Sequence, residues 1–290
     1  MNATSSTVNT PPVIDDALCA HLREQARRIR ELTIRMIGRS GSGHPGPALS
    51  IADALAVLYH HVMRVDPHNP HWPERDRFVL SKGHGCASLY VTLADRGYFP
   101  IDWLWTFRQA GSVLSGHPSM KDNPGVDMTT GSLGQGLSAA NGMALAARLD
   151  GLAYRVYCIL GDGECQEGQV WEAALTASHR KLDNVTALLD ANGLQIDGPT
   201  ARIKNVEPLD AKWRAFGWNV ITVDGHDVDQ IASALAAARA HRGQPTLVLM
   251  HTVKGKGVSY MEGQVDWHGK APDADETRRA LAELGAADHG

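Results

Sequence analysis

Two short segments of the chain carry the side chains best suited to metal and phosphate chemistry. The first is Gly161-Asp162-Gly163, and the second is Asp190-Ala191-Asn192-Gly193-Leu194. A carboxylate, an amide oxygen and a main-chain carbonyl are ligands that a hard divalent cation takes while keeping positions free for phosphate oxygens or water. The glycines around Asp162 let the backbone approach a phosphate closely. An ordinary glycine turn is the alternative for the first segment alone, but the spacing to Asn192 favours a metal and phosphate site.

The elements around these segments explain how the two side chains could meet. Each segment follows a short apolar run, residues 156–160 and residues 185–189, and both runs are typical of buried parallel strands. Residues 169–180 carry apolar side chains at helical spacing, so the whole segment predicts a strand, a helix and a strand. The carboxyl ends of such strands face the ligand crevice. We therefore expect Asp162 and Asn192 to face the same crevice.

The rest of the chain continues this alternation. Further strands are expected at residues 78–80, 220–223 and 246–250, and a glycine loop at 81–85 should open a helix that ends near residue 96. Other helices are expected at residues 16–38, 49–62, 133–149, 227–242 and 277–284. The pattern predicts an α/β fold with a mostly parallel sheet and helices on both faces. Residues 1–14 are expected to form a disordered lead-in, and residues 15–290 a single domain.

Composition narrows the classes of function. The 290 residues are 43% apolar and carry a formal charge of −4, which supports a substantial core and argues against a nucleic-acid partner. No apolar run approaches the roughly twenty residues of a membrane span, and the first residues lack a signal-peptide core. The four cysteines form no paired motif, so reduced thiols are expected rather than a zinc site or disulfides. We expect a cytoplasmic protein without a membrane partner.

Five of the fourteen histidines lie next to glycine, where a loop can bring an imidazole close to a ligand. Imidazole can donate to phosphate or exchange protons near neutral pH. For any one of these histidines, a solvated loop position is as good an interpretation as a functional one. The five are His44, His84, His117, His226 and His268.

Longer motifs connect these observations to a known family. The sequences GDGECQEGQVWEAA and KLDNVTALLDANGLQIDG resemble the thiamine diphosphate signature of transketolases, and SGHPG, SKGHG, SGHP and WHGKAP fall where transketolases place their histidines. The resemblance implies the thiamine diphosphate-binding fold, with the cofactor bound together with Mg²⁺ or Ca²⁺. By this resemblance, the metal ligands are Asp162, Asn192 and the carbonyl of Leu194.

The resemblance also implies roles for other residues. His84 and His268 would hold the diphosphate side, and Lys254 would lie near the cofactor. His226 also matches the family's sequence, but its position favours a role at a helix entry. The loop from Thr129 to Gly136 would line the aminopyrimidine, although a glycine-softened helix start is also compatible with it. Likewise, Lys254 could be part of a solvated basic turn, and the positive helix end alone could account for Glu167. The implied cofactor contacts are His84, Gly131, Ser132, Leu133, Gly163, Glu164, Asn192, Lys254 and His268; the implied catalytic residues are His44, His117 and His268; and Glu167 and Glu172 would lie at a subunit contact.

The resemblance covers about residues 16–272 and leaves part of a transketolase unaccounted for. A complete transketolase continues with a pyrimidine-binding domain, which carries the glutamate that activates the cofactor, and a C-terminal domain. The chain therefore resembles the N-terminal subunit of a split transketolase that acts in an α2β2 heterotetramer with a separate C-terminal subunit. It would transfer a two-carbon ketol unit from a ketose phosphate to an aldose phosphate, as in the pentose phosphate pathway.

Three alternatives remain at this point. The first is a split enzyme of the same kind that acts on an unusual sugar. The second is another thiamine diphosphate enzyme, such as a deoxyxylulose phosphate synthase, although the histidine motifs argue against it. The third is a non-catalytic binding subunit, against which the intact metal pair and histidines count.

Overall fold

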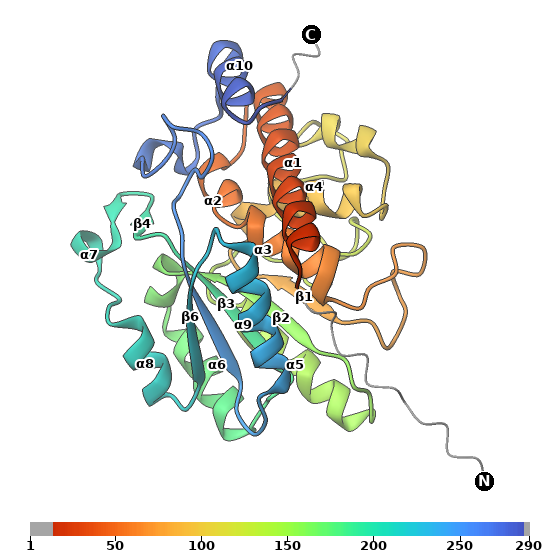
Figure 1. Ribbon diagram of the computed structural model, residues 1–290, viewed down its shortest axis with the longest axis vertical. Coiled ribbons are helices and arrows are strands. Elements are labelled where there is room, and N and C mark those ends of the chain that lie inside the picture. Colours follow the sequence, from red (N-terminus) through yellow and green to blue (C-terminus); the bar gives the residue numbers. More distant parts are fainter. Residues whose placement is uncertain (1–13, 287–290) are drawn as a thin grey trace.

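A five-stranded parallel sheet lies at the centre of the computed structural model, which describes residues 14–286 (Figure 1). The strands follow the order β1-β2-β3-β7-β6, and every neighbouring pair is parallel. All five predicted strands are present, so the predicted α/β class is confirmed. The strands are β1 (Arg77–Leu80), β2 (Val156–Gly161), β3 (Val185–Ala191), β6 (Asn219–Asp224) and β7 (Thr246–His251).

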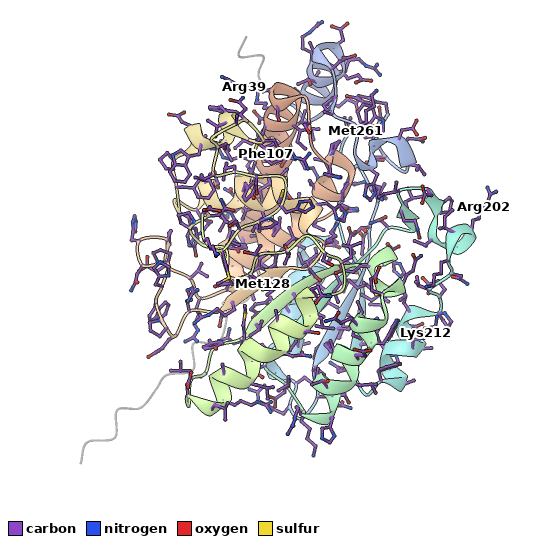
Figure 2. The ribbon with its side chains drawn as sticks, turned by 180° about the vertical axis from the view of Figure 1, so that it is seen from behind. Arg39, Phe107, Met128, Arg202, Lys212 and Met261 are labelled. Carbon is purple, nitrogen blue, oxygen red and sulfur yellow. The ribbon has the colours of Figure 1, made fainter. Side chains whose placement is uncertain are left out.

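The sheet buries both of its faces. On one face, Tyr157 and Ile159 of β2 join a core with α1 (Asp16–Ser40), α3 (Ala52–Val57), α4 (Cys86–Asp95) and α9 (Val228–Ala240). On the other face, Val156, Cys158 and Leu160 of the same strand join a core with α5 (Gly136–Leu149), α6 (Gly168–His179) and α8 (Leu209–Ala215). Figure 1 shows α9 in front of the sheet and α1 above it, and Figure 2 shows the green helices α5 and α6 covering the other side of the sheet.

The register of the sheet brings the strand ends together. Gly161 at the end of β2 is level with Asp190 in β3, and Ala191 at the end of β3 is level with His251 at the end of β7. Because these strands are parallel, their carboxyl ends lie along one edge of the sheet. Loops from several strands therefore meet at this edge.

The first and last helices pack against each other and differ slightly from their predicted bounds. The side chain of Asp15 caps α1 by accepting from Leu18 N at 2.8 Å. The helix ends at Ser40, two residues later than expected, where Gly41 follows with φ 63°. The helix α10 (Ala274–Glu283) begins three residues earlier than expected, because Asp273 and Glu276 form a capping box. Figure 1 shows α10 beside the end of α1.

The predicted single helix over residues 49–62 is wrong. The structure has α2 (Pro45–Leu49), α3 and a π-helical turn η1 (Leu58–Val62) instead. At the break, the hydroxyl of Ser50 donates to the carboxylate of Asp190 at 2.7 Å and lies 3.2 Å from the carbonyl of Pro47. A tertiary contact to the sheet therefore interrupts a segment whose local pattern suits one helix.

The helix predicted over residues 133–149 begins later, at Gly136, because Gly134 adopts a left-handed turn with φ 85°. The helix packs closely against its surroundings at Gly136, where an added Cβ would lie 2.5 Å from Ser81 Cβ, but not at Gly142, where an added Cβ would meet nothing within 4 Å. The helix α9 is also shorter than the predicted 227–242, and Asp227 caps it.

Several short elements were not predicted. They are η2 (Gly83–Gly85), η3 (Ile101–Thr106), η4 (Gly163–Gln166), η5 (Val265–His268), the hairpin of β4 (Leu194–Gln195) and β5 (Gly198–Pro199), α7 (Thr200–Ile203) and α8. In Figure 2, the labels Arg202 and Lys212 mark α7 and α8. The predicted lead-in lies outside the described residues except for Ile14, which packs against the core. No helix within residues 14–286 is both long and apolar enough to cross a membrane.

Candidate functional site

A cavity of about 430 Å³ opens at the carboxyl edge of the sheet. The segments that follow β1, β2, β3 and β7 all contribute to its walls, together with the loop before α2 and the segment of η5. It therefore collects motifs that are spread over most of the sequence. Its lining includes His44, Lys82, His84, His117, Gly131, Leu133, Asp162, Gly163, Glu164, Glu167, Asn192, Leu194, Ile196, Lys254 and His268.

The two segments suited to metal and phosphate chemistry meet as expected. One carboxylate oxygen of Asp162 accepts from the N–H of Gly163 at 2.8 Å, and the other accepts from the N–H of Gly193 at 2.5 Å. The amide oxygen of Asn192 accepts from Leu194 N at 3.1 Å, and its amide nitrogen donates to Asp190 at 3.1 Å. The predicted pair Asp162 and Asn192 thus lines one cavity from adjacent strands.

The carboxylate of Asp162 lies where a cation would stabilise it. Burial, followed by the negative charge of Asp190, raises the pKa of Asp162 to about 6, against the opposing hydrogen bonds from Gly193 and Gly163. Within residues 14–286, no basic side chain forms an ion pair with Asp162. A bound cation would remove the cost of holding this buried charge.

The oxygen donors around Asp162 fit a hard divalent cation. They are one carboxylate, the Asn192 amide oxygen and the Leu194 carbonyl, all lining the same cavity. No cluster of three His, Cys, Asp or Glu side chains suited to a metal occurs in the described part of the chain. A site with a single carboxylate needs further oxygens from a ligand, and a diphosphate would provide them.

Lys254 links the predicted metal and diphosphate positions. Its ammonium donates to the Leu194 carbonyl at 2.7 Å and lies 2.9 Å from Nδ1 of His268. Burial, followed by the positive charge of Lys82, lowers the pKa of Lys254 to about 8. The lysine is 2% exposed, which excludes the alternative of a solvated basic turn.

A buried ion pair beneath the cavity was not predicted from the sequence. The ammonium of Lys82 lies 2.5 Å from the carboxylate of Asp190, which also accepts from the hydroxyls of Ser50 and Thr252. Burial would raise the pKa of Asp190, but the charge of Lys82 and these hydrogen bonds outweigh it and lower the pKa. The sequence signal for this ion pair is a lysine and an aspartate placed directly at the ends of apolar strands, because a charge buried there needs a partner of opposite charge.

Four of the five predicted histidines lie in the cavity wall. The ring centroids of His44, His84 and His268 are 5.1 to 5.9 Å apart, and the rings of His84 and His268 are stacked. His117 lies against Gly131, where an added Cβ would be 3.4 Å from the imidazole. The structure therefore brings together all the histidines that the family motifs contain, apart from His226.

These histidines are held in their neutral form. Burial, followed by nearby positive charge, lowers the pKa of His44 to about 4 and that of His268 to about 3. The pKa of His84 falls well below its ordinary value for the same reasons, and the pKa of His117 also falls. At neutral pH each ring therefore keeps one N–H donor and one acceptor nitrogen.

His226 is not in the cavity, but its role differs from the predicted helix entry. The cap of α9 is Asp227, whose side chain accepts from Asp229 N at 3.0 Å. Nδ1 of His226 instead lies 2.8 Å from the carboxylate of Asp53, and Nε2 accepts from Val253 N at 2.8 Å. This histidine ties α3 to the loop after β7.

The remaining predicted residues divide between the wall and the surface. Glu164 lines the cavity, but its carboxylate is used inside the protein, where it accepts from Ser81 and from the N–H groups of Gly134 and Gly161. Gly131 and Leu133 line the cavity, whereas Ser132 is exposed outside the lining. Glu167 lines the cavity at the start of α6, and Glu172 is exposed on that helix.

Known proteins share this arrangement over almost the whole chain. Residues 22–289 match the family described as transketolase, thiamine diphosphate binding domain. The chain belongs to the transketolase family. Its predicted thiamine diphosphate-binding fold is confirmed by transketolase from Leishmania mexicana, which superposes with a TM-score of 0.88 at 36% identity. That match covers 93% of this chain and 42% of the Leishmania protein.

Two relatives of similar length are themselves subunits. The chain is 52% identical over 263 residues to the 6-deoxy-6-sulfo-D-fructose transketolase subunit SqwG of a Clostridium species, covering 91% of this chain and 96% of SqwG. It is 40% identical over 263 residues to an apulose-4-phosphate transketolase subunit of Phocaeicola vulgatus, covering 91% of this chain and 93% of that relative. The prediction of an N-terminal subunit of a split transketolase is confirmed by these matches.

Proposed function

We propose that this transketolase subunit holds the diphosphate end of thiamine diphosphate through a divalent cation. The cation, Mg²⁺ or Ca²⁺, would be bound by Asp162, Asn192 and the Leu194 carbonyl. The observation that carries this proposal is the buried Asp162 carboxylate without a basic partner among residues 14–286, in a wall that also presents imidazoles and an ammonium. His84, His268 and Lys254 would bind the diphosphate, with Gly163, Glu164 and Asn192 shaping the turn around it.

The reaction would be ketol transfer from a ketose phosphate to an aldose phosphate. Thiamine diphosphate supplies the carbon nucleophile when it is bound, so the protein contributes orientation and proton transfer. His44, His117 and His268 would bind the sugar hydroxyls and move protons, since neutral imidazoles can donate and accept at the same time. Gly131 and Leu133 would contact the aminopyrimidine, and the Ser132 contact stays a prediction.

A partner chain would complete the site. We propose a C-terminal subunit that carries the pyrimidine-binding domain and the activating glutamate, in an α2β2 assembly. The exposed side chains of Leu149 on α5 and Leu175 on α6, which are 86% and 56% exposed, support a protein contact on that face. Glu167 and Glu172 lie at the start and on the outside of α6, where such a contact could link two active sites.

The donor sugar has two candidates. Xylulose 5-phosphate would place the enzyme in the pentose phosphate pathway. The second candidate is a 6-deoxy-6-sulfo ketose, which carries a sulfonate in place of the phosphate, because identity to the sulfofructose relative is 52%, against 40 to 42% for the apulose relatives. We propose a cytoplasmic location for either reaction, which the four unpaired, buried thiols support.

Reconstitution with a panel of donors tests this proposal. The chain and its C-terminal partner are mixed with thiamine diphosphate and Mg²⁺. Ketol transfer to an aldose phosphate is measured from the two candidate donors, xylulose 5-phosphate and 6-deoxy-6-sulfofructose, and from apulose 4-phosphate for comparison. We expect transfer from at least one donor, and the ratio of kcat/KM values identifies the preferred one. A complex that binds the cofactor but transfers no ketol unit from any donor would favour the non-catalytic alternative.

A further inference from the structure

Arg108 lies behind His44 and does not line the cavity. It follows η3 and the buried Phe107, with its guanidinium carbon 5.6 Å from the centre of the Phe107 ring. Its backbone has φ 57°, the left-handed conformation that residues with a side chain rarely adopt, and its N–H donates to Leu114 O at 2.9 Å. The chain therefore holds this arginine in one specific place.

The guanidinium makes polar contacts to the loop that carries His44. Nη1 donates to the hydroxyl of Ser42 at 2.9 Å, and Nη2 lies 3.3 Å from Nδ1 of His44 and 3.5 Å from the carbonyl of Gly116. An added Cβ at Gly116 would lie 2.6 Å from Nη2, so glycine leaves the space that Arg108 fills. Within the described residues no carboxylate forms an ion pair with Arg108.

The chemistry of a guanidinium fixes the direction of the His44 contact. Arginine has five N–H donors and no acceptor, so Nδ1 of His44 must be the acceptor. In a neutral imidazole, the proton is then on Nε2. Nε2 has no partner among residues 14–286, and His44 itself lines the cavity. The donor nitrogen is therefore the one that a ligand can reach.

We infer that Arg108 is a positioning residue that fixes His44 as the Nε2–H tautomer, so that His44 donates a hydrogen bond to an oxygen of the sugar substrate. The part that concerns the sugar rests on the proposed function. The part that concerns the tautomer rests on the contacts of Arg108 alone. Arg108 thereby determines whether His44 meets the substrate as a donor or as an acceptor.

The charge of Arg108 acts in the same direction as its hydrogen bond. The groups near His44 are Arg108, His117, His84 and His268, with Lys82 and Lys254 beyond the last two. After burial, Arg108 is the largest cause of the lowered pKa of His44. It therefore keeps the ring neutral as well as oriented.

Nitrogen NMR of the imidazole tests the tautomer without any catalytic assay. The protein is labelled with ¹⁵N-histidine, and His44→Gln assigns the His44 signals. In the wild type we expect an unprotonated Nδ1 and a protonated Nε2 between about pH 5.5 and 8, above the lowered pKa of His44. Arg108→Met should give mixed tautomers and a higher His44 pKa, whereas Arg108→Lys should keep the pKa low. A wild-type ring protonated on Nδ1, or an Arg108→Met spectrum equal to that of the wild type, would overturn the inference.

Kinetics of the reconstituted complex test the link to the sugar. Arg108→Met should lower kcat by about tenfold to a hundredfold with a smaller change in KM, and move the acid limb of the pH profile to higher pH. In the His44→Gln background, the same substitution should cause no further loss, because the two residues act as a unit. Additive losses would contradict the inference. A wild-type complex without ketol transfer would refute the proposed function and leave the NMR result unaffected.

Discussion

The ammonium of Lys82 and the carboxylate of Asp190 form a buried ion pair, 2.5 Å apart, directly beneath the cavity. The pair connects the end of β1 to β3, and Asp190 in turn holds Ser50, Thr252 and Asn192. It therefore anchors the turn that presents Asn192 to the proposed metal.

Lys82→Met should destabilise the chain strongly. Removing one partner of a buried pair leaves an uncompensated charge and costs about 3–5 kcal/mol. The free energy of unfolding in urea measures this cost. Lys82→Met/Asp190→Asn is the control, and it should recover part of the loss because no buried charge is left. A single variant as stable as the wild type, or a double variant less stable than the single, would contradict this assignment.

Two glycines of α5 should respond in opposite ways to the same substitution. Gly136→Ala places a Cβ 2.5 Å from Ser81 Cβ and should cost about 1–3 kcal/mol. Gly142→Ala meets nothing within 4 Å and should stabilise the chain by about 0.5–1 kcal/mol, because alanine loses less backbone entropy in a helix. Thermal melts of the isolated chain compare the two. Equal effects of both variants would show that the contact to Ser81 is not tight.

Stability should fall as the pH drops below about 6.5, the ordinary histidine value. Burial, followed by the charge of Arg96, lowers the pKa of His60 to about 4, and the side chain is 7% exposed. Between about pH 6.5 and pH 4, His60 binds a proton in the unfolded chain but not in the folded chain. Lowering the pH through this range therefore favours unfolding. Asp95 opposes this shift and His21 adds to it.

His60→Leu separates this effect from other titrations. The slope of Tm against pH between about 6.5 and 4.5 should be smaller in the variant than in the wild type. At about pH 8 the wild-type imidazole is neutral in both the folded and the unfolded chain. The difference in Tm between the two proteins at that pH therefore measures only how the substitution changes packing. Parallel curves for the two proteins would show that His60 does not contribute.

Asp162→Ala should abolish the metal dependence of cofactor binding. The substitution removes the only carboxylate of the proposed donor set, so thiamine diphosphate should bind the reconstituted complex equally weakly with and without Mg²⁺. Titration calorimetry measures the affinity, and Asp210→Ala, an exposed carboxylate on α8, is the control that should retain the wild-type response. A metal-dependent affinity that survives in Asp162→Ala would remove the metal assignment.

The sequence predicted the features that depend on local patterns. Apolar runs identified all five strands, and the ends of β2 and β3 correctly placed Asp162 and Asn192 together. Features that depend on distant contacts were missed. The break at Ser50 follows from its bond to Asp190, and the place of Arg108 follows from a left-handed backbone and a space beside Gly116. No local pattern of side chains encodes either contact.

The histidines also divide into those whose place the sequence predicted and one whose place depends on distant contacts. Family motifs identified the four that line the cavity, because each lies in a glycine loop at the carboxyl edge of the sheet. His226 matched a motif as well, yet it ties Asp53 to Val253. Only the three-dimensional arrangement separates an imidazole that faces a cavity from one that bridges two elements.

Whether the active site is divided between two chains is decided most simply by the rate of ketol transfer. The rate is measured for this chain alone, for the C-terminal partner alone and for their mixture. Each sample contains saturating thiamine diphosphate, Mg²⁺, the preferred donor and an aldose phosphate. We expect that only the mixture is active, with a rate that saturates at an equimolar ratio of the two chains. Ketol transfer by this chain alone would contradict the divided site.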